Sequence, residues 1–190
     1  MDTVQKLKEI EDEIKKCKKC PLHEKRKNPV AGEGNPDAKV LLIGLGPGYN
    51  ENLQGSPFVG AAGKFLDELL GLANLKREDV FITNIMKCYL PNNFATQEEI
   101  ETCTPYLERQ IEIIRPKVII TLGNVATSFI FEKFGLKVQR IGEIHGEIFK
   151  VDNLFKTRII PMYHPASALY NPNMKEILRE DWKKISKLKI

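Results

Sequence analysis

Four cysteines are the residues whose type and spacing most clearly suggest chemistry in this sequence of 190 residues. Cys17 and Cys20 form a C-x-x-C pair, which is the usual spacing for two thiolates on one metal centre, and Cys88 and Cys103 follow much later. Either all four are ligands of one metal site, or a lone C-x-x-C accompanies two ordinary buried cysteines. Lysines surround these cysteines at positions 15, 16, 18, 19 and 87. Positive neighbours of this kind would favour thiolates. Zinc and an iron–sulfur cluster both accept four thiolates, and spacing does not choose between them.

Three further side chains are candidates for binding a small, flat group. Asn84 ends an apolar run, where its amide could donate to one carbonyl and accept from a neighbouring N–H, or could simply close a turn. Phe58 lies in the loop segment GSPFVG, where its ring is either a stacking surface or a plug of the core. His164 follows another apolar run and precedes Pro165, as a catalytic or as a structural histidine. His23 and His145 have no convincing partner in the sequence.

Two glycine-rich segments resemble nucleotide-binding loops but lack residues that such loops need to bind a nucleotide. The segment Gly44–Gly48 has Tyr49 where the third glycine of a dinucleotide-binding motif belongs. The segment from Gly55 to Gly60 has the glycine spacing of a Walker A motif, but two alanines replace its Lys and Ser/Thr. What remains is a loop rich in backbone N–H groups that can approach a flat ligand or a phosphate closely.

Alternating helices and strands must position these residues. Buried strands are expected at 40–43, 80–85, 118–122 and 158–162, and residues 146–151 form a further strand, in a hairpin with the last. Helices are expected at 2–16, at 61–73, from the Thr96/Glu99 capping box to before Pro116, from 124 to about 134, and from about 173 to 187. Segments 21–37, 49–60 and 164–172 are expected to be loops.

This alternation predicts an α/β sandwich with a mainly parallel sheet. Its functional site should lie beyond the carboxyl ends of the strands, which here carry GLGPG, NIMKC, LGN and YHP. The sequence shows no internal repeat, low-complexity segment or linker. Residues 1–190 are therefore expected to form one domain.

Composition narrows the class of protein further. The chain is 42% hydrophobic and 28% charged, enough for one domain that buries about 70% of its unfolded surface. No apolar run approaches the roughly 20 residues needed to cross a membrane, and the charged amphipathic N-terminus is no secretory signal. We therefore expect a cytoplasmic protein, in a compartment where structural disulfides are uncommon. The net charge of +4 rests on lysine clusters. These indicate solvated helix faces, common in thermophiles, or a nucleic-acid partner.

Taken together, the motifs resemble those of the iron–sulfur uracil-DNA glycosylases of families 4 and 5. The matching segments are C-x-x-C at 17–20, GLGPG at 44–48, GSPFVGAAG at 55–63, NIMKCYLPNN at 84–93, Cys103, LGNVA at 122–126 and YHPAS at 163–167. Each is weak alone, but their order and their place at strand ends are specific. The resemblance implies a three-layer α/β/α sandwich with a central, mainly parallel four-stranded sheet. It also implies a 4Fe-4S cluster held by Cys17, Cys20, Cys88 and Cys103.

The reaction implied by this resemblance is hydrolysis of the N-glycosidic bond of deoxyuridine, flipped out of single- or double-stranded DNA by a monomeric enzyme. Phe58 would stack on the uracil, Asn84 would read N3–H and O4, and His164 would donate to O2. A neutral His164 suits that role. The implied substrate-binding turn is Gly44, Leu45, Gly46, Pro47 and Gly48. Leu169 would fill the gap in the duplex, and Ser167 of the same loop would contact DNA.

One departure from family 4 puts the activation of water in doubt. Leu45 occupies a position where that family usually has Glu, as in the apolar first motif of family 5, whereas the PFVG segment resembles family 4. Glu51 alone remains of the acidic cluster. It would orient water, stabilise the cationic sugar or crowd out the thymine methyl group. Alternatives are a broader glycosylase acting on hypoxanthine or G·T thymine, a non-catalytic binder of damaged DNA, and a zinc module with another activity. No lysine is placed for a Schiff base, so the implied glycosylase is monofunctional.

Overall fold

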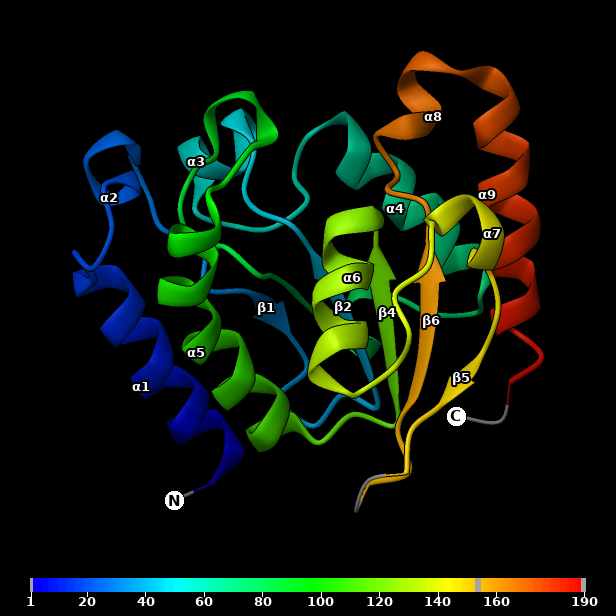
Figure 1. Ribbon diagram of the computed structural model, residues 1–190, viewed down its shortest axis with the longest axis horizontal. Helices are drawn as coiled ribbons and strands as arrows, with labels where there is room; N and C mark the ends of the chain where they lie inside the picture. The colour runs from blue at the N-terminus through cyan, green and yellow to red at the C-terminus, as the bar shows by residue number, and fades with distance from the viewer. Residues whose placement is uncertain (1, 153–154, 189–190) are drawn as a thin grey trace.

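The computed structural model describes residues 2–152 and 155–188, which fold around a mainly parallel sheet (Figure 1). The strands are β1 (Glu33–Gly34), β2 (Val40–Gly44), β3 (Val80–Asn84), β4 (Val118–Leu122), β5 (Phe149–Lys150) and β6 (Arg158–Met162), in the order β1-β3-β2-β4-β6-β5. The four central strands are parallel, and β1 and β5 pair antiparallel at the two edges. The predicted four-stranded parallel sheet is thus present, with two short edge strands added.

Helices cover both faces of the sheet, so the predicted three layers are confirmed (Figure 1). The helices are α1 (Thr3–Lys16), α2 (Leu22–Lys25), α3 (Tyr49–Gln54), α4 (Ala61–Leu72), α5 (Gln97–Ile114), α6 (Asn124–Lys133), α7 (Ile141–Ile144), α8 (Ser167–Tyr170) and α9 (Pro172–Ile185). Two 3-10 turns, η1 (Arg77–Asp79) and η2 (Pro91–Asn93), accompany them. Helices α1, α5 and α6 pack on one face, and α4 and α9 pack on the other.

Alternation along the strands divides the core between the two helical layers. On β2, Leu41 and Ile43 face the layer of α1, α5 and α6, whereas Val40 and Leu42 face α4 and α9. All four are 1% exposed or less, as expected for a strand buried on both faces. The expected inward face of α4 is confirmed by the burial of its apolar residues, Phe65, Leu66, Leu69 and Leu70.

Several short helices and strands differ from those predicted from the sequence, and these predictions were wrong. Helices α2, α3 and α8 and strand β1 lie in segments that we expected to be loops, and β5 covers only 149–150 of the expected strand at 146–151. These elements are two to six residues long, so they show too little periodicity to be recognised. The capping box of α5 is present, because Thr96 Oγ1 accepts from Glu99 N and a Glu99 carboxylate oxygen accepts from Thr96 N.

In the described part of the chain, no helix is both long and apolar enough to cross a membrane. The site candidates at 44–48, 84 and 164 lie at or just after the ends of β2, β3 and β6, and these parallel strands end at the same edge of the sheet. The fold therefore brings together segments up to 120 residues apart in the sequence.

Candidate active site

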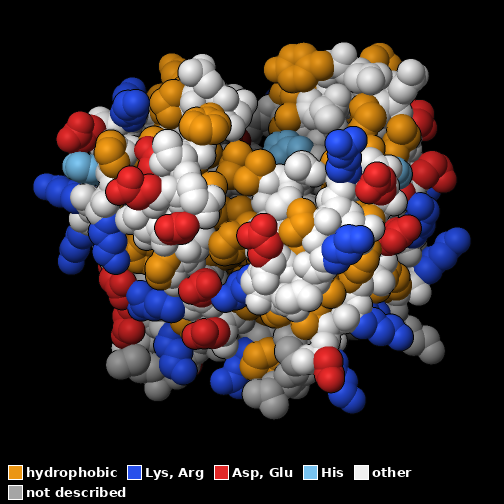
Figure 2. All heavy atoms as spheres, in the orientation of Figure 1, with side chains coloured by type: hydrophobic (Ala, Val, Ile, Leu, Met, Phe, Trp, Pro, Cys, Tyr) orange, Lys and Arg blue, Asp and Glu red, His pale blue; other side chains and the backbone are white. Residues whose placement is uncertain are grey.

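A cavity of about 370 Å³ lies at the carboxyl ends of β2, β3 and β6. Figure 2 shows its opening as a hollow between two lobes near the top of the view. The cavity is lined by Leu45, Gly46, Gly48, Glu51, Phe58, Ala62, Asn84, Leu90, Asn93, His164 and Ala166. Its volume falls in the range of small-molecule sites, with mostly apolar walls and a few polar groups. Phe58, Asn84 and His164, which the sequence singled out separately, meet in it.

Asn84 is the last residue of β3, and only 2% of it is exposed. Its backbone carbonyl accepts a hydrogen bond of 2.7 Å from Lys87 Nζ. Its side-chain amide lines the cavity. Within the described residues, the buried side-chain polar atom without a partner is Trp182 Nε1, so the Asn84 amide is not sealed off from the cavity. The amide is therefore available to a ligand that both donates and accepts a hydrogen bond.

His164 follows β6, and the turn after it determines which ring nitrogen carries the proton. Ala166 N donates to His164 Nδ1 at 3.1 Å, so Nδ1 is the unprotonated nitrogen of a neutral ring. Nε2 is then the N–H donor available in the cavity. Burial lowers the pKa of His164 to about 4, and the opposing effect of the Glu51 carboxylate is smaller. The neutral, donating histidine that the sequence analysis favoured is therefore the form that this fold stabilises.

Phe58 presents its ring to the same cavity in a strained backbone conformation. The ring stacks on His164 with centroids 5.5 Å apart and an interplanar angle of 26°. Its φ is +52°, which is rare for a bulky residue and costs about 1–3 kcal/mol. Arg77 holds the loop, because its guanidinium donates to the carbonyls of Pro57 (3.2 Å) and Phe58. Gly63 is required beneath the loop, since a Cβ there would lie 1.7 Å from the Phe58 carbonyl oxygen.

The turn Gly44–Gly48 is held against the segment that follows β3. The carbonyls of Gly44 and Leu45 accept from Ile85 N and Met86 N at 3.0 and 2.8 Å. With these carbonyls engaged, the turn offers its N–H groups to a ligand. Gly44 is needed for close approach, because a Cβ there would fall 2.5 Å from Asn84 Oδ1. Of the five predicted residues, Leu45, Gly46 and Gly48 line the cavity, and Gly44 and Pro47 lie behind it.

Glu51 lies on α3 and supplies the negative charge of the cavity lining. Its Oε1 accepts from Val59 N at 2.9 Å and Gly60 N at 3.2 Å, so this oxygen ties α3 to the loop that carries Phe58. The carboxylate therefore has a positioning contact that the sequence did not indicate. Leu45, by contrast, presents an apolar wall where a carboxylate would sit in family 4.

The two predicted DNA-binding residues lie on α8, outside the cavity lining. Ser167 Oγ donates to the His164 carbonyl at 2.7 Å, so this hydroxyl closes the turn that carries the histidine. Leu169 is 46% exposed and borders a separate groove with Lys64 and Lys175. The groove lies between α4, α8 and α9. Leu169 is thus placed to project from the surface beside the cavity.

Four lining residues were not predicted as site residues, namely Ala62, Leu90, Asn93 and Ala166, and two of them bear on the shape and polarity of the cavity. Asn93, at the end of η2, has a φ of +52° and adds a second amide to the cavity, and Leu90 packs under Gly46. Both lie in the segment NIMKCYLPNN, where a proline followed by two asparagines indicates a turn. That signal predicts the local conformation but not the direction in which Asn93 points. Arg77 was also missed, because its contacts lie about twenty residues away in the sequence.

All four cysteines border one small pocket between α1, α2, the segment after β3, and α5. Burial raises the pKa of Cys88, and raises that of Cys103 to about 11, against the opposing effects of Arg26 and Lys87. Lys87 does lower the pKa of Cys103, as expected of a positive neighbour, but the effect of burial is larger. Arg26 donates to Cys88 Sγ at 3.1 Å and to the Cys17 carbonyl at 2.9 Å.

The four cysteines supply a donor set of thiols around one pocket. In the described part of the chain, no three His, Cys, Asp or Glu side chains are grouped closely enough to hold one metal ion. Four thiols are a donor set that both zinc and an iron–sulfur cluster accept, so the residues present fit the cluster that the sequence resemblance implies.

Lys87 connects the cysteine pocket with the cavity. It is almost fully buried, and its Nζ donates to Thr83 Oγ1, the Asn84 carbonyl and Gln110 Oε1 at 2.7–2.8 Å. Burial lowers the pKa of Lys87 to about 7, with Cys103 opposing the effect. These bonds fix the end of β3, and therefore the position of Asn84.

His145 has a partner that the sequence did not indicate. Its Nδ1 lies 2.5 Å from Asp181 Oδ2, and Lys184 contacts the other oxygen of the same carboxylate at 2.7 Å. These residues join the end of α7 to α9, outside the cavity lining. They explain a buried aspartate in α9 as part of a structural ion pair.

Comparison with known proteins adds a family to this geometry. Residues 31–186 match the model of the uracil DNA glycosylase superfamily. A type-4 uracil-DNA glycosylase of Saccharolobus solfataricus is 50% identical over 93% of this chain and 83% of its own length. Another, of Archaeoglobus fulgidus, is 46% identical over 97% and 94%. A type-5 uracil-DNA glycosylase of Pyrobaculum aerophilum is 31% identical over 75% of this chain and 68% of its own length.

Proposed function

The chain belongs to the uracil DNA glycosylase superfamily, and we propose that it removes uracil from DNA by hydrolysing the N-glycosidic bond. The reaction leaves an abasic site for later repair. Since the cavity lies inside the protein surface, the target nucleotide must leave the base stack to reach it. Residues 1–190 act as one catalytic domain, because α1 packs on α5 and the cysteine pocket joins both to the segment after β3.

Uracil is recognised by a ring surface and a polar edge. Phe58 stacks on the flipped base, and the Asn84 amide pairs with N3–H and O4. Cytosine lacks this donor–acceptor pattern, since its exocyclic group at C4 donates. The apolar wall of Leu45 and Leu90 contacts the remaining edge of the base. The meeting of Phe58, Asn84 and His164 in one cavity is the observation that carries this proposal.

His164 stabilises the leaving group. As the glycosidic bond breaks, negative charge grows on the uracil ring, including O2, and positive charge grows on the sugar. His164 Nε2–H donates to O2, and N–H groups of the turn Gly44–Gly48 add further donors. Fixed donors act mainly in the transition state, where one such bond contributes about 10²–10³-fold in rate. The low pKa of His164 keeps it neutral, so it holds its proton rather than transferring it.

Water is positioned by the two polar lining groups that the base does not use. These are the Glu51 carboxylate and the Asn93 amide. Glu51 also stabilises the cationic sugar by its charge. Leu45 has no carboxylate that could act as a general base, and general base catalysis typically contributes ~10²–10⁴-fold in rate. The reaction tolerates this loss because uracil is a good leaving group.

Cys17, Cys20, Cys88 and Cys103 hold a 4Fe-4S cluster. When bound, the cluster supplies a covalent link between α1, the segment after β3 and α5. Arg26 donates to the sulfur of Cys88, and Lys87 links this region to Asn84 by donating to the Asn84 carbonyl. A structural role follows from the placement of the cysteines, which do not line the cavity.

A monomer binds the DNA through the groove between α4, α8 and α9, beside the cavity. Leu169 enters the space that the flipped base vacates in a duplex, as apolar wedges do in other DNA-bending proteins. Lys64 and Lys175, beside Leu169, neutralise phosphates. Ser167 keeps the His164 turn closed, because both its N–H and its Oγ donate to the His164 carbonyl, and it lies next to the DNA strand in this arrangement.

The test is single-turnover base release from matched duplexes that carry U·G, U·A, T·G or hypoxanthine opposite thymine, with abasic sites revealed by hot alkali. We expect rapid release from both uracil duplexes alone. Release of hypoxanthine or thymine as well would favour the broader glycosylase, for which Leu45 is the favouring feature. Binding of every duplex without release would overturn the proposed activity and leave a non-catalytic binder of damaged DNA.

A further inference from the structure

Three exposed aromatic residues lie close in the chain to residues that line the cavity. The exposed fractions of Tyr49, Phe94 and Tyr170 are 64%, 67% and 88%. In the part of the chain that the structure describes, the large exposed hydrophobic residues include these three aromatic ones, and the others are aliphatic. An exposed aromatic ring does not gain the free energy that burial would provide. Three such rings near one cavity therefore indicate a binding role.

Each ring is adjacent to the cavity lining in the chain. Tyr49 follows the lining residue Gly48, and Phe94 follows Asn93. Tyr170 ends α8, four residues after the lining residue Ala166. Helices α3 and α8 lie on opposite sides of the opening at the same end of the sheet (Figure 1). Figure 2 shows hydrophobic side chains on both lobes beside the hollow. The rings thus belong to segments on both sides of the opening rather than to one wall of it.

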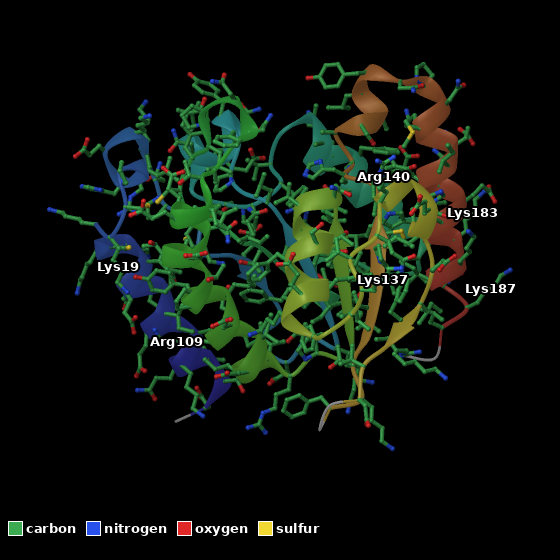
Figure 3. The ribbon with its side chains drawn as sticks, in the orientation of Figure 1. Lys19, Arg109, Lys137, Arg140, Lys183 and Lys187 are labelled. Atoms are coloured by element: carbon green, nitrogen blue, oxygen red, sulfur yellow. The ribbon has the colours of Figure 1, made fainter. Side chains whose placement is uncertain are left out.

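Charge is not concentrated at this opening. Glu51 is the ionised carboxylate in the lining, and no lysine or arginine lines the cavity. The basic residues labelled in Figure 3 lie on the two flanks, with Lys19 and Arg109 near α1 and α5 and the others near α7 and α9. The opening therefore offers ring faces where many DNA-binding surfaces offer cations.

We propose that Tyr49, Phe94 and Tyr170 stack on the unpaired bases next to the flipped uracil, so that the opening is a binding surface for single-stranded DNA. This inference rests on the proposed function, since a base in the cavity places its two covalently attached neighbours at the rim. Aromatic rings bind successive bases of a single strand without sequence preference, because every base has a π-face. In a duplex these neighbours remain paired and stacked on each other, so the rings favour a single strand.

The test pairs removal of a ring with removal of a base. The probe is a single-stranded oligonucleotide with a central 2′-fluoro-2′-deoxyuridine, whose glycosidic bond resists hydrolysis, and its binding is followed by fluorescence anisotropy. In a second probe, the nucleotides on both sides of the uridine are tetrahydrofuran abasic analogues. The variants are Tyr49→Ala, Phe94→Ala, Tyr170→Ala and Tyr170→Trp, with Ile148→Ala as a control at an exposed position before β5.

We expect each alanine variant at the rim to raise Kd about tenfold on the first probe and less than twofold on the second. Tyr170→Trp and Ile148→Ala should bind like the parent protein. Equal losses on both probes, or no loss on either, would overturn the inference. An unchanged Kd for DNA together with lost capture of another protein would also overturn it, in favour of a protein partner at the rim.

Uracil release from an unmodified single strand, at saturating enzyme, keeps this test separate from the proposed function. If the parent protein releases uracil while the ring variants bind both probes normally, the stacking inference fails and the glycosylase stands. If the parent protein releases no uracil, the glycosylase fails, and with it the inference that rests on it.

Discussion

Asn84 is the residue whose chemistry most narrowly defines the ligand. Its amide lies at the end of β3 and lines the cavity, where a ligand can reach it. The same group can donate to O4 and accept from N3–H only as an amide. A carboxylate in its place would keep the shape, lose the donor and bring a negative charge close to O4.

We therefore expect Asn84→Asp to lower the single-turnover rate of uracil release roughly a hundredfold or more, in line with the loss of one fixed donor plus a repulsion. The rate is measured on a duplex with a U·G pair. Asn74→Asp, at an exposed position outside the cavity, is the matched control and should retain the parent rate. A near-parent rate for Asn84→Asp would remove Asn84 from recognition.

His164 should remain neutral over the working pH range. Because its folded-state pKa of about 4 lies below the ordinary value of about 6.5, the folded chain binds fewer protons than the unfolded chain between these values. This residue therefore contributes stability above about pH 6.5, and the contribution is lost as the pH falls toward 4. Protonation of Nδ1 would also remove the hydrogen bond from Ala166 N.

The corresponding measurement is ¹⁵N NMR of the histidine rings, with His164 assigned by its absence in His164→Gln. We expect the Nε2–H tautomer without titration from pH 8 down to pH 5. A midpoint near the ordinary value of 6.5 would contradict both the neutral histidine and the mechanism built on it.

At the scale of elements, the loop before α4 depends on contacts distant in sequence. Phe58 adopts a positive φ and stays there because Arg77 binds the carbonyls of Pro57 and Phe58 from η1. Arg77 also pairs with Asp67 at 2.5 Å, which orients the guanidinium from α4. The ring that we propose to stack on uracil is thus positioned by a residue outside the cavity lining.

Arg77→Ala should weaken uracil binding and raise the KM for a uracil-containing oligonucleotide about tenfold, with a smaller effect on kcat, since the ring loses its position rather than its chemistry. Addition of guanidinium ion at millimolar concentration should restore part of the activity. Arg179→Ala removes a comparable surface arginine, paired with Glu68 and Glu176, and should leave KM unchanged. Equal KM values for the two variants would exclude this positioning role.

The elements with strong patterns could be predicted, and the short ones could not. The four parallel strands and helices α1, α4, α5, α6 and α9 follow from apolar periodicity, capping and proline signals. Helices α3 and α8, which carry Glu51, Tyr49 and Leu169, are four to six residues long and depend on tertiary contacts. The tautomer of His164 and the direction of Asn93 could not be predicted either. Both depend on a backbone arrangement that exists only in the folded chain.

At the scale of the whole molecule, one side of the fold depends on the cysteine pocket. It joins α1 and α2 to the segment after β3 and to α5, and Lys87 extends the connection to Asn84. Because the four sulfurs come from three separate regions, loss of one ligand should release the cluster and loosen all of them.

Cys103→Ser, purified anaerobically, should therefore lack the brown colour and the absorption near 400 nm, contain little iron and unfold at a lower temperature. Circular dichroism and iron analysis provide the readouts. Thr104→Ser, at the neighbouring helical position, is the control and should keep both colour and Tm. A colourless Cys103→Ser protein with the parent Tm and activity would refute the structural role of the cluster.

Surface charge is spread over the whole molecule rather than gathered at the cavity. Many lysines of the N- and C-terminal helices pair with acidic neighbours on the same helix, as Lys8 does with Glu11 and Lys183 with Glu180. Solvated helix faces therefore explain these lysines better than a DNA-binding patch does. Segments that are far apart in the sequence, from the turn after β2 to α8, meet at the opening of the cavity.

A crystal structure with an oligonucleotide containing 2′-fluoro-2′-deoxyuridine tests the central claim most directly. The account predicts uracil in the cavity, stacked on Phe58, with N3–H and O4 paired to the Asn84 amide and O2 within hydrogen-bond distance of His164 Nε2. Uracil bound elsewhere, or bound here with the Asn84 amide still unpartnered, would contradict it.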